Sequence, residues 1–119
     1  MVDNLRASIP TGAPAPKFRR GDTIPVNVKY DYKGIPQEGR FKFEIGTGVY
    51  PLFTSKHAWT EKSLQLAGAM DWESREFDAS FVIPTTIALG LYSSRGTLRT
   101  ISDVTQEIDT DWSALEIVA

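Results

Sequence analysis

The 119-residue chain has no cysteine and a single histidine, and these two shortages exclude several kinds of chemistry. Without cysteine there are no disulfides, no thiolate nucleophile and no cysteine-ligated zinc. With one histidine there is also no zinc site that uses two histidine ligands. Any Ser-His-Asp arrangement would need His57 as its base, and His57 lies in a polar stretch with no nucleophile turn nearby. We therefore predict no catalytic residues, no enzyme activity and no cofactor.

Long apolar runs and an excess of positive charge are also missing. No stretch approaches the roughly 18 apolar residues of a membrane span, and residues 1–6 lack the basic start and apolar centre of a secretion signal. The net charge of −2 gives no general attraction to nucleic acid. We predict a soluble chain with no membrane insertion and no nucleic-acid partner. The sequence does not determine where the protein is located; a virion or an extracellular surface is the location that we consider.

The chain does have apolar alternation with the period of a β-strand. From residue 23 to residue 32 the even positions are apolar, and residues 40–46 and 77–83 repeat the pattern with odd positions apolar. Leu5 and Ala7 alternate in the same way and predict a short edge strand. No segment longer than a few residues follows helical periodicity. The predicted strands of the main domain cover residues 23–32, 40–46, 64–66, 77–83, 91–100 and 104–118.

Turn residues between these strands predict how the chain reverses. Residues 33–39 contain glycine and proline, so we expect a hairpin-like connection that pairs the strands on either side. Pro25 lacks a donor for the strand ladder, so its strand should lie at an edge near its start or point that position outward. Residues 70–75 are predicted to form a loop that holds Trp72 among charges.

Two parts are distinguished along the chain. Residues 1–17 contain three prolines and a glycine, and we interpret them as a leader or arm. Residues 18–119 are predicted to form one domain. Within it, Ser94 and Gly96 leave volume on the inward face of strand 91–100, and we expect a tryptophan to fill that volume.

The stretch around Gly90 and Tyr92 carries a family resemblance. Gly90 marks a corner after one apolar run, and Tyr92 opens the next. This resembles the tyrosine corner of immunoglobulin-like and fibronectin-type-III-like sandwiches, in which the phenol packs inside and its hydroxyl bonds to upstream backbone. The resemblance implies an all-β fold: an immunoglobulin-like antiparallel β-sandwich of about seven strands with an extended N-terminal leader. Antibody-type domains carry a cysteine where this chain has Ser94, so only the general sandwich is implied.

Aromatic residues outside the clean alternation are the candidates for contact with a ligand or partner. Exposed aromatics on a sandwich stack on sugar rings or anchor protein partners. The alternative is that they fill the core. The four candidates are Tyr50, Phe53, Trp59 and Trp72.

Two further motifs are weaker. Glu107, Asp109 and Asp111 alternate near the C-terminal end, where they are weak candidates for calcium ligands or form a solvated acidic bend. Arg20-Gly21-Asp22 resembles the integrin-recognition tripeptide, but a turn is expected there for structural reasons alone. We therefore predict no metal site.

The resulting functional prediction is a non-catalytic structural or interaction module, such as a virion accessory or decoration protein or another assembly component. Its partner would be a protein or a second copy of the chain. The alternative is a carbohydrate-binding or adhesion module of a secreted protein, which would show a coplanar pair of exposed aromatics. A metal-dependent hydrolytic domain is a third hypothesis and would depend on Asp109 and Asp111.

Overall fold

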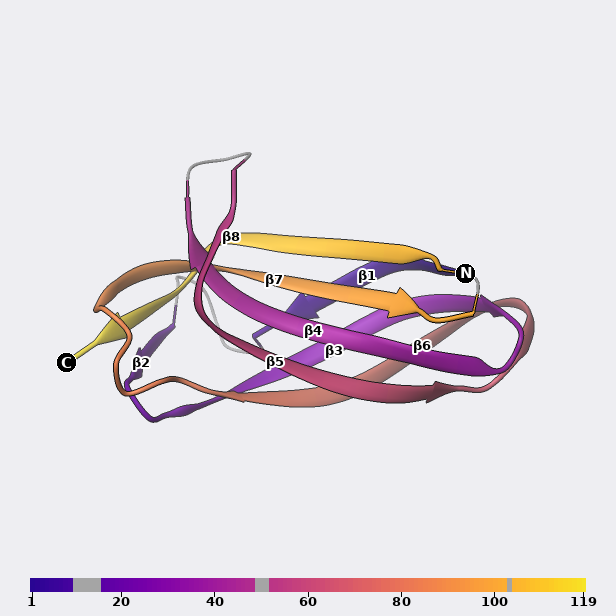
Figure 1. Cartoon of the computed structure of the whole chain (residues 1–119), viewed down its shortest axis with the longest axis horizontal. Coiled ribbons are helices and arrows are strands. Elements are labelled where there is room, and N and C mark those ends of the chain that lie inside the picture. Colours follow the sequence, from indigo (N-terminus) through magenta and orange to yellow (C-terminus); the bar gives the residue numbers. More distant parts are fainter. Residues whose placement is uncertain (10–15, 49–51, 103) are drawn as a thin grey trace.

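The computed structural model of the chain is all-β, with strands in two sheets that pack face to face (Figure 1). It describes residues 1–9, 16–48, 52–102 and 104–119, without the side chains of residues 55–59. Among these residues there is no helix long and apolar enough to span a bilayer. The strands are β1 (Val2–Ser8), β2 (Lys17–Arg19), β3 (Thr23–Gly34), β4 (Gln37–Thr47), β5 (Thr54–Leu66), β6 (Ala69–Val82), β7 (Gly90–Thr100) and β8 (Gln106–Val118).

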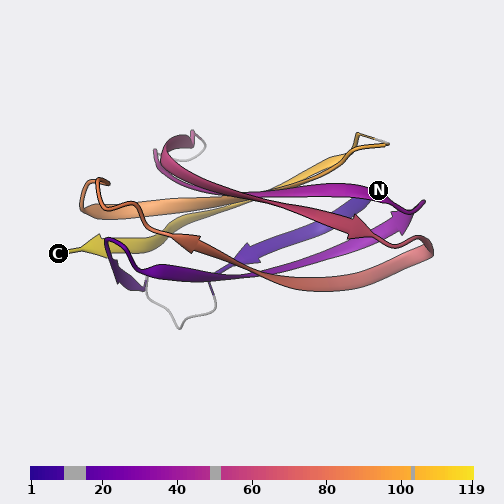
Figure 2. The ribbon, with the colours of Figure 1, turned by 60° about the horizontal axis from the view of Figure 1, so that its bottom comes forward.

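The strands divide unequally between the two layers, which Figure 2 shows from a second direction. One sheet has the order β1-β3-β6, and the other has the order β2-β8-β7-β4-β5. All neighbouring strands are antiparallel except the short β2, which pairs parallel with β8. The predicted all-β sandwich is therefore confirmed, with eight strands in the described part of the chain instead of about seven.

Strand alternation builds the core as the sequence pattern predicts. In β3 the even positions from Ile24 to Tyr32 are all buried, with exposed fractions between 0 and 6%. In β4 the inward residues are Phe41, Phe43 and Ile45, each 0% exposed. Burial of each such side chain is worth about 1.5–3 kcal/mol, so these two strands supply much of the stability of the sandwich.

The connection between β3 and β4 differs from its prediction. The two strands do not pair as a hairpin; they lie in opposite sheets and face each other across the core. Gly34 has a φ of 145°, and the Tyr32 hydroxyl donates to the Ile35 carbonyl and accepts from Gln37 Nε2 at 2.7 Å. Alternation shows which residues of a strand face inward. It does not show whether two successive strands pair in one sheet or face each other across the core, because the same residues are buried in both cases.

The predicted loop at residues 70–75 is also wrong, because these residues belong to β6, and residues 73–75 pair with β3. Residues 70–74 are exposed on both faces of the strand, so they show no alternation. Arg75 holds this end of the strand in place. Its guanidinium lies 4.9 Å from the centre of the Tyr32 ring and donates to the Ala67 carbonyl at 2.6 Å and to Glu73 at 3.0 Å.

The corner at Tyr92 has the predicted geometry. The ring is buried, with 5% of the side chain exposed, and the hydroxyl donates to the Ala88 carbonyl at 2.7 Å. The expectation of a tryptophan over Gly96 is wrong, because a Cβ at Gly96 would meet the Cβ of Ala7 at 2.4 Å and the Phe41 ring at 3.2 Å. Close approach of β1 to β7 therefore fills the volume left by the small residues.

Part of the predicted leader lies in the sheet. Val2–Ser8 forms β1, the edge strand that alternation at Leu5 and Ala7 predicts, and Ala7 is only 1% exposed. β1 pairs with Asn27 to Tyr32 of β3, so Pro25 lies beyond the part of β3 that β1 covers. This agrees with an edge position near the start of the strand. The division of the chain at residue 17 stays a prediction.

Charged side chains close both seams between the sheets. At one seam β1 lies against β8, and Asp109 Oδ2 accepts the Ala7 amide at 3.0 Å. At the other seam β5 lies against β6, and Lys62 Nζ donates to the Asp78 carbonyl at 3.1 Å. Each charge satisfies a backbone group of an edge strand, a known protection against unwanted strand pairing.

Candidate functional site

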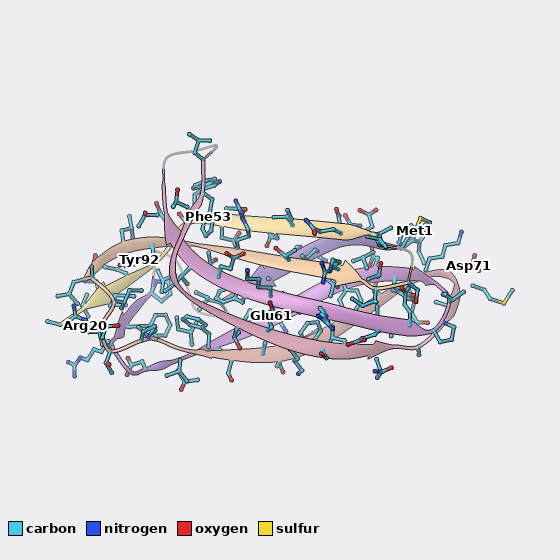
Figure 3. All side chains as sticks on the ribbon, in the orientation of Figure 1. Met1, Arg20, Phe53, Glu61, Asp71 and Tyr92 are labelled. Atoms are coloured by element: carbon cyan, nitrogen blue, oxygen red, sulfur yellow. The ribbon has the colours of Figure 1, made fainter. Side chains whose placement is uncertain are left out.

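The four predicted aromatic contact residues do not gather at one place in the described structure. Phe53 lies just before β5, whereas Trp72 is 49% exposed on β6 of the other sheet. Figure 3 shows Phe53 and the neighbour of Trp72, Asp71, at opposite ends of the sandwich. Tyr50 lies outside the described residues, and Trp59 is in β5 opposite Glu44 with its side chain not described.

The acidic row Glu107, Asp109 and Asp111 lies along β8, where a bend was predicted. The three residues pair with Leu98, Gly96 and Ser94 of β7. The irregularity of this strand pair instead falls beyond Asp111, at residues 112–114. No group of three or more histidines, cysteines or acids among the described residues is placed to hold a metal ion.

Burial dominates the electrostatics of this row. It raises the pKa of Asp111 to about 6, with a smaller contribution from the negative charge of Asp109. Burial also raises the pKa of Glu107, and a side-chain hydrogen bond with Asp3 and the charge of Asp3 add to the effect. Asp109 has a structural role, because it accepts the Ala7 amide of the edge strand β1.

The Arg20-Gly21-Asp22 tripeptide forms a turn whose side chains are occupied. Arg20 Nε donates to the Ile87 carbonyl at 2.7 Å, and Asp22 Oδ2 accepts the Arg19 amide at 2.7 Å. Gly21 has a φ of 84°, which glycine adopts without strain. The structural interpretation of this motif therefore accounts for all three residues.

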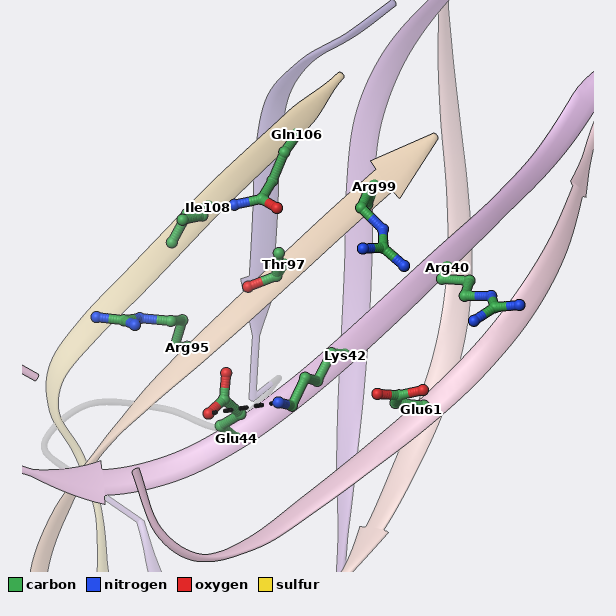
Figure 4. A pocket seen from close by; sticks show the side chains of 9 residues that line it. All are labelled: Arg40, Lys42, Glu44, Glu61, Arg95, Thr97, Arg99, Gln106 and Ile108. Atoms are coloured by element: carbon green, nitrogen blue, oxygen red, sulfur yellow. Dashed lines mark ion pairs between the residues drawn. The ribbon is translucent and has the colours of Figure 1, made fainter. Parts of the chain in front are cut away.

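A different surface, on the outer face of the five-stranded sheet, has the most distinctive arrangement of charge. A hollow of about 380 Å³ lies there (Figure 4). We call this surface the arginine face and define it by the residues that line the hollow. They are Arg40, Lys42, Glu44, Glu61, Arg95, Thr97, Arg99, Gln106 and Ile108.

Strand register brings these side chains together. Arg40 of β4 is directly opposite Arg99 of β7, and two residues along β4, Lys42 is opposite Thr97. Because directly opposite residues share a face of the sheet, the two arginines project on the same side, as Figure 4 shows. The two arginines are therefore neighbours although 58 residues separate them in the chain.

Most cations of the arginine face have a partner. Lys42 Nζ lies 4.0 Å from Glu44 Oε2, and Arg40 Nε lies 3.7 Å from Glu38 Oε1. The Arg99 guanidinium differs, because within the described part of the chain it makes no hydrogen bond or ion pair.

An aromatic group borders the same face. The Arg95 guanidinium lies 4.3 Å from the centre of the Phe53 ring, and Arg95 Nε donates to Thr110 Oγ1 at 3.4 Å. The Phe53 and Trp112 ring centroids are 6.4 Å apart in an edge-to-face arrangement. Of the four predicted aromatic candidates, Phe53 is thus placed beside the arginine face.

Folding does not account for the opposed arginines. Like charges directly opposite on neighbouring strands destabilise a sheet. The sequence contained part of the signal, since Arg40 and Lys42 are outward positions of a predicted strand. The missing part was the pairing of β4 with β7 and its register, which bring Arg99 opposite Arg40.

Comparisons with known proteins bear on the fold alone. No protein-family model and no curated protein sequence matches the chain. A crystal structure of Spo0M, a sporulation control protein from Bacillus subtilis, is similar with a TM-score of 0.53 and 12% identity. The match covers 99% of this chain and 49% of that protein, so the chain spans about half its length. At this identity the likeness supports an all-β fold of two sheets and carries no function.

Proposed function

We propose that the chain is a non-catalytic, immunoglobulin-like interaction module that binds an acidic protein partner on its arginine face. The observation that carries this proposal is the pair formed by Arg40 and Arg99. The two cations are directly opposite each other, and Arg99 has no partner among the described residues. A negatively charged group on a partner would remove the repulsion between them.

Strand order supports the immunoglobulin-like assignment. In that fold, strands A, B and E share one sheet, and strands G, F and C share the other, with an additional strand C′ beside C. Here β1-β3-β6 correspond to A, B and E, and β8-β7-β4-β5 correspond to G, F, C and C′. Tyr92 then lies in strand F, where the tyrosine corner belongs.

The lining of the hollow supports binding rather than catalysis. Among the described lining residues there is no histidine and one hydroxyl group, that of Thr97. Of the two carboxylates in the lining, Glu44 is occupied by an ion pair with Lys42 at 4.0 Å. A reaction would require a nucleophile and a base in mutual contact, and these residues do not provide such a pair.

The mixed character of the face favours a protein over a polyanion. Glu44 and Glu61 lie among the cations and would repel the continuous charge of nucleic acid or a sulfated polysaccharide. Ile108 is 51% exposed in the same hollow, the Phe53 ring contacts Arg95 of the lining, and the Trp112 ring packs on Phe53. Arginine and aromatic residues together are typical of the energetically important part of a protein interface.

Titration with a synthetic glutamate-rich peptide tests the proposal, with tryptophan fluorescence as the signal because Trp112 packs on Phe53, the ring in contact with Arg95. We expect binding by the wild type and an increase of about tenfold or more in Kd for Arg99→Gln, the loss of at least one charge-assisted hydrogen bond. Arg19→Gln is the matched control, because Arg19 is an exposed arginine on β2 outside the hollow.

Two results would overturn the proposal. One is equal peptide affinity for the wild type and Arg99→Gln. The other is binding of heparin that exceeds peptide binding and depends on Arg99, which would instead support the carbohydrate-binding alternative.

A further inference from the structure

The outer face of the three-stranded sheet carries an acidic pair that mirrors the opposed arginines. Glu76 and Asp78 occupy alternate positions of β6, and the side-chain amide of Asn27 donates to both, at 2.8 Å and 3.2 Å. Two carboxylates therefore converge on one neutral group. Neither forms an ion pair with any described residue, although Lys29 is directly opposite Glu76 in the ladder.

We infer that the acidic partner of the arginine face is the pair Glu76 and Asp78 of a second copy of this chain. The inference depends on the proposed function and specifies its partner. Opposed residues on neighbouring strands have Cβ atoms about 5 Å apart, and alternate residues of one strand are separated by about 6.6 Å. The two arginines and the two carboxylates are therefore spaced closely enough for each guanidinium to meet one carboxylate.

Each pair brings two like charges close together in the isolated molecule, whereas contact between copies would bring opposite charges together. Arg40 repels Arg99 on one sheet, and Glu76 repels Asp78 on the other. The core of the sandwich separates the two faces, so neither pair can neutralise the other within one molecule. Contact between copies removes both repulsions and allows charge-assisted hydrogen bonds between guanidinium and carboxylate groups.

The position of the faces determines the kind of assembly. The arginine face and the acidic pair lie on the two opposite outer surfaces of the sandwich. A contact between two different surfaces is heterologous, and such contacts repeat as an open chain unless a rotation closes them into a ring. We therefore expect the copies to stack, with the arginine face of each copy against the acidic pair of the next. One arginine face stays free at one end of the stack.

Pairing between edge strands is the competing route to self-association, and the described contacts oppose it. Lys62 points from the edge strand β5 to the Asp78 carbonyl of the edge strand β6. Its ammonium group also lies 5.3 Å from the centre of the Phe77 ring. A charge held in this seam hinders the entry of another strand. Association through sheet faces leaves this contact intact.

Sedimentation velocity across a concentration series tests the inference. For the wild type we expect a mean mass that rises continuously with concentration and returns to that of the monomer in about 1 M salt, where charges are screened beyond ~3 Å. Arg99→Glu and Glu76→Lys should each lower the association constant by about tenfold or more. Arg19→Glu should associate like the wild type, because Arg19 lies outside both faces.

Charge exchange makes the test specific to these residues. The double variant Arg99→Glu with Glu76→Lys carries exchanged charges and should regain association. An equimolar mixture of the two single variants should regain it too, since their faces are complementary. The exposed Glu76 position also provides a variant that leaves the arginine face unchanged.

Three outcomes separate this inference from the proposed function. A wild type that stays monomeric but binds the glutamate-rich peptide overturns self-association and leaves the acidic-partner proposal standing. A wild type that does neither overturns both. A dimer that does not grow with concentration, or a double variant that fails to regain association, overturns the contact between Arg99 and Glu76.

Discussion

Replacement of Asp111 by asparagine should stabilise the protein at neutral pH and leave it unchanged in acid. The carboxyl group of Asp111 lies on β8 opposite the buried Ser94. Burial, followed by the charge of Asp109, raises the pKa of Asp111 from 3.8 to about 6. The charged form is therefore disfavoured in the folded protein, and asparagine has nearly the same shape without the charge.

The sign of the pH dependence follows from the direction of the shift. Because the folded pKa is the higher one, the folded state binds more protons than the unfolded state between pH 3.8 and about 6. The contribution of Asp111 to stability is fully present below pH 3.8 and is lost as pH rises through about 6. The unfolding free energy of the wild type should fall across this window relative to that of Asp111→Asn.

The magnitude is limited by solvent. The full shift corresponds to about 3 kcal/mol at 1.36 kcal/mol per pKa unit. The side chain of Asp111 is only partly buried, so solvent screening reduces this value, and we expect about 1 kcal/mol. Asp111→Asn should therefore be more stable than the wild type by about 1 kcal/mol near pH 8 and equally stable near pH 3.

Urea unfolding followed by tryptophan fluorescence measures this difference at each pH. Asp71→Asn is the control, because Asp71 is an exposed carboxylate on β6 and its replacement should have little effect. Equal stabilisation of Asp111→Asn at both pH values would refute the electrostatic explanation. Destabilisation near pH 8 would show that the carboxylate has a favourable contact.

Three further changes test the contacts that hold the sandwich together. Tyr92→Phe removes the hydrogen bond to the Ala88 carbonyl and should cost about 0.5–1.5 kcal/mol in urea unfolding; no loss would show that the corner does not depend on the hydroxyl. Gly96→Ala places a Cβ 2.4 Å from that of Ala7, so we expect a loss of about 1–3 kcal/mol and faster proteolysis within β1. Unchanged proteolysis would contradict the close packing of β1 on β7. Lys62→Ala removes the charge from the seam between β5 and β6, and light scattering should show aggregation that persists in high salt; a variant as monodisperse as the wild type in high salt would contradict the protective role.

The sequence predicted side-chain faces better than strand connections. Alternation identified the inward residues of β3 and β4, because a strand with one buried face requires apolar residues at every second position. It did not show that these strands lie in opposite sheets. It also missed the first half of β6, where residues 70–74 are exposed on both faces and Arg75 replaces burial with contacts to Tyr32 and Ala67.

The tyrosine corner was predictable because its signal is local. Gly90 and Tyr92 lie close together in the chain, and the hydroxyl reaches a carbonyl only four residues upstream. The acidic row on β8 was a harder case. Its spacing is equally visible in the sequence, but the role of Asp109 depends on β1, which lies 102 residues away and brings the Ala7 amide to it.

The candidate site could not be predicted from the sequence either, because it depends on the pairing of β4 with β7. At an outward strand position the fold requires only a side chain that tolerates water, so threonine or glutamine would serve at residue 99 as well as arginine. Opposite Arg40, arginine is a poorer choice for stability than either. The same reasoning applies to Glu76 beside Asp78 on the other sheet. Outward positions where like charges lie side by side are the ones whose identity the fold does not explain, and the proposed contact with another molecule would supply the missing reason.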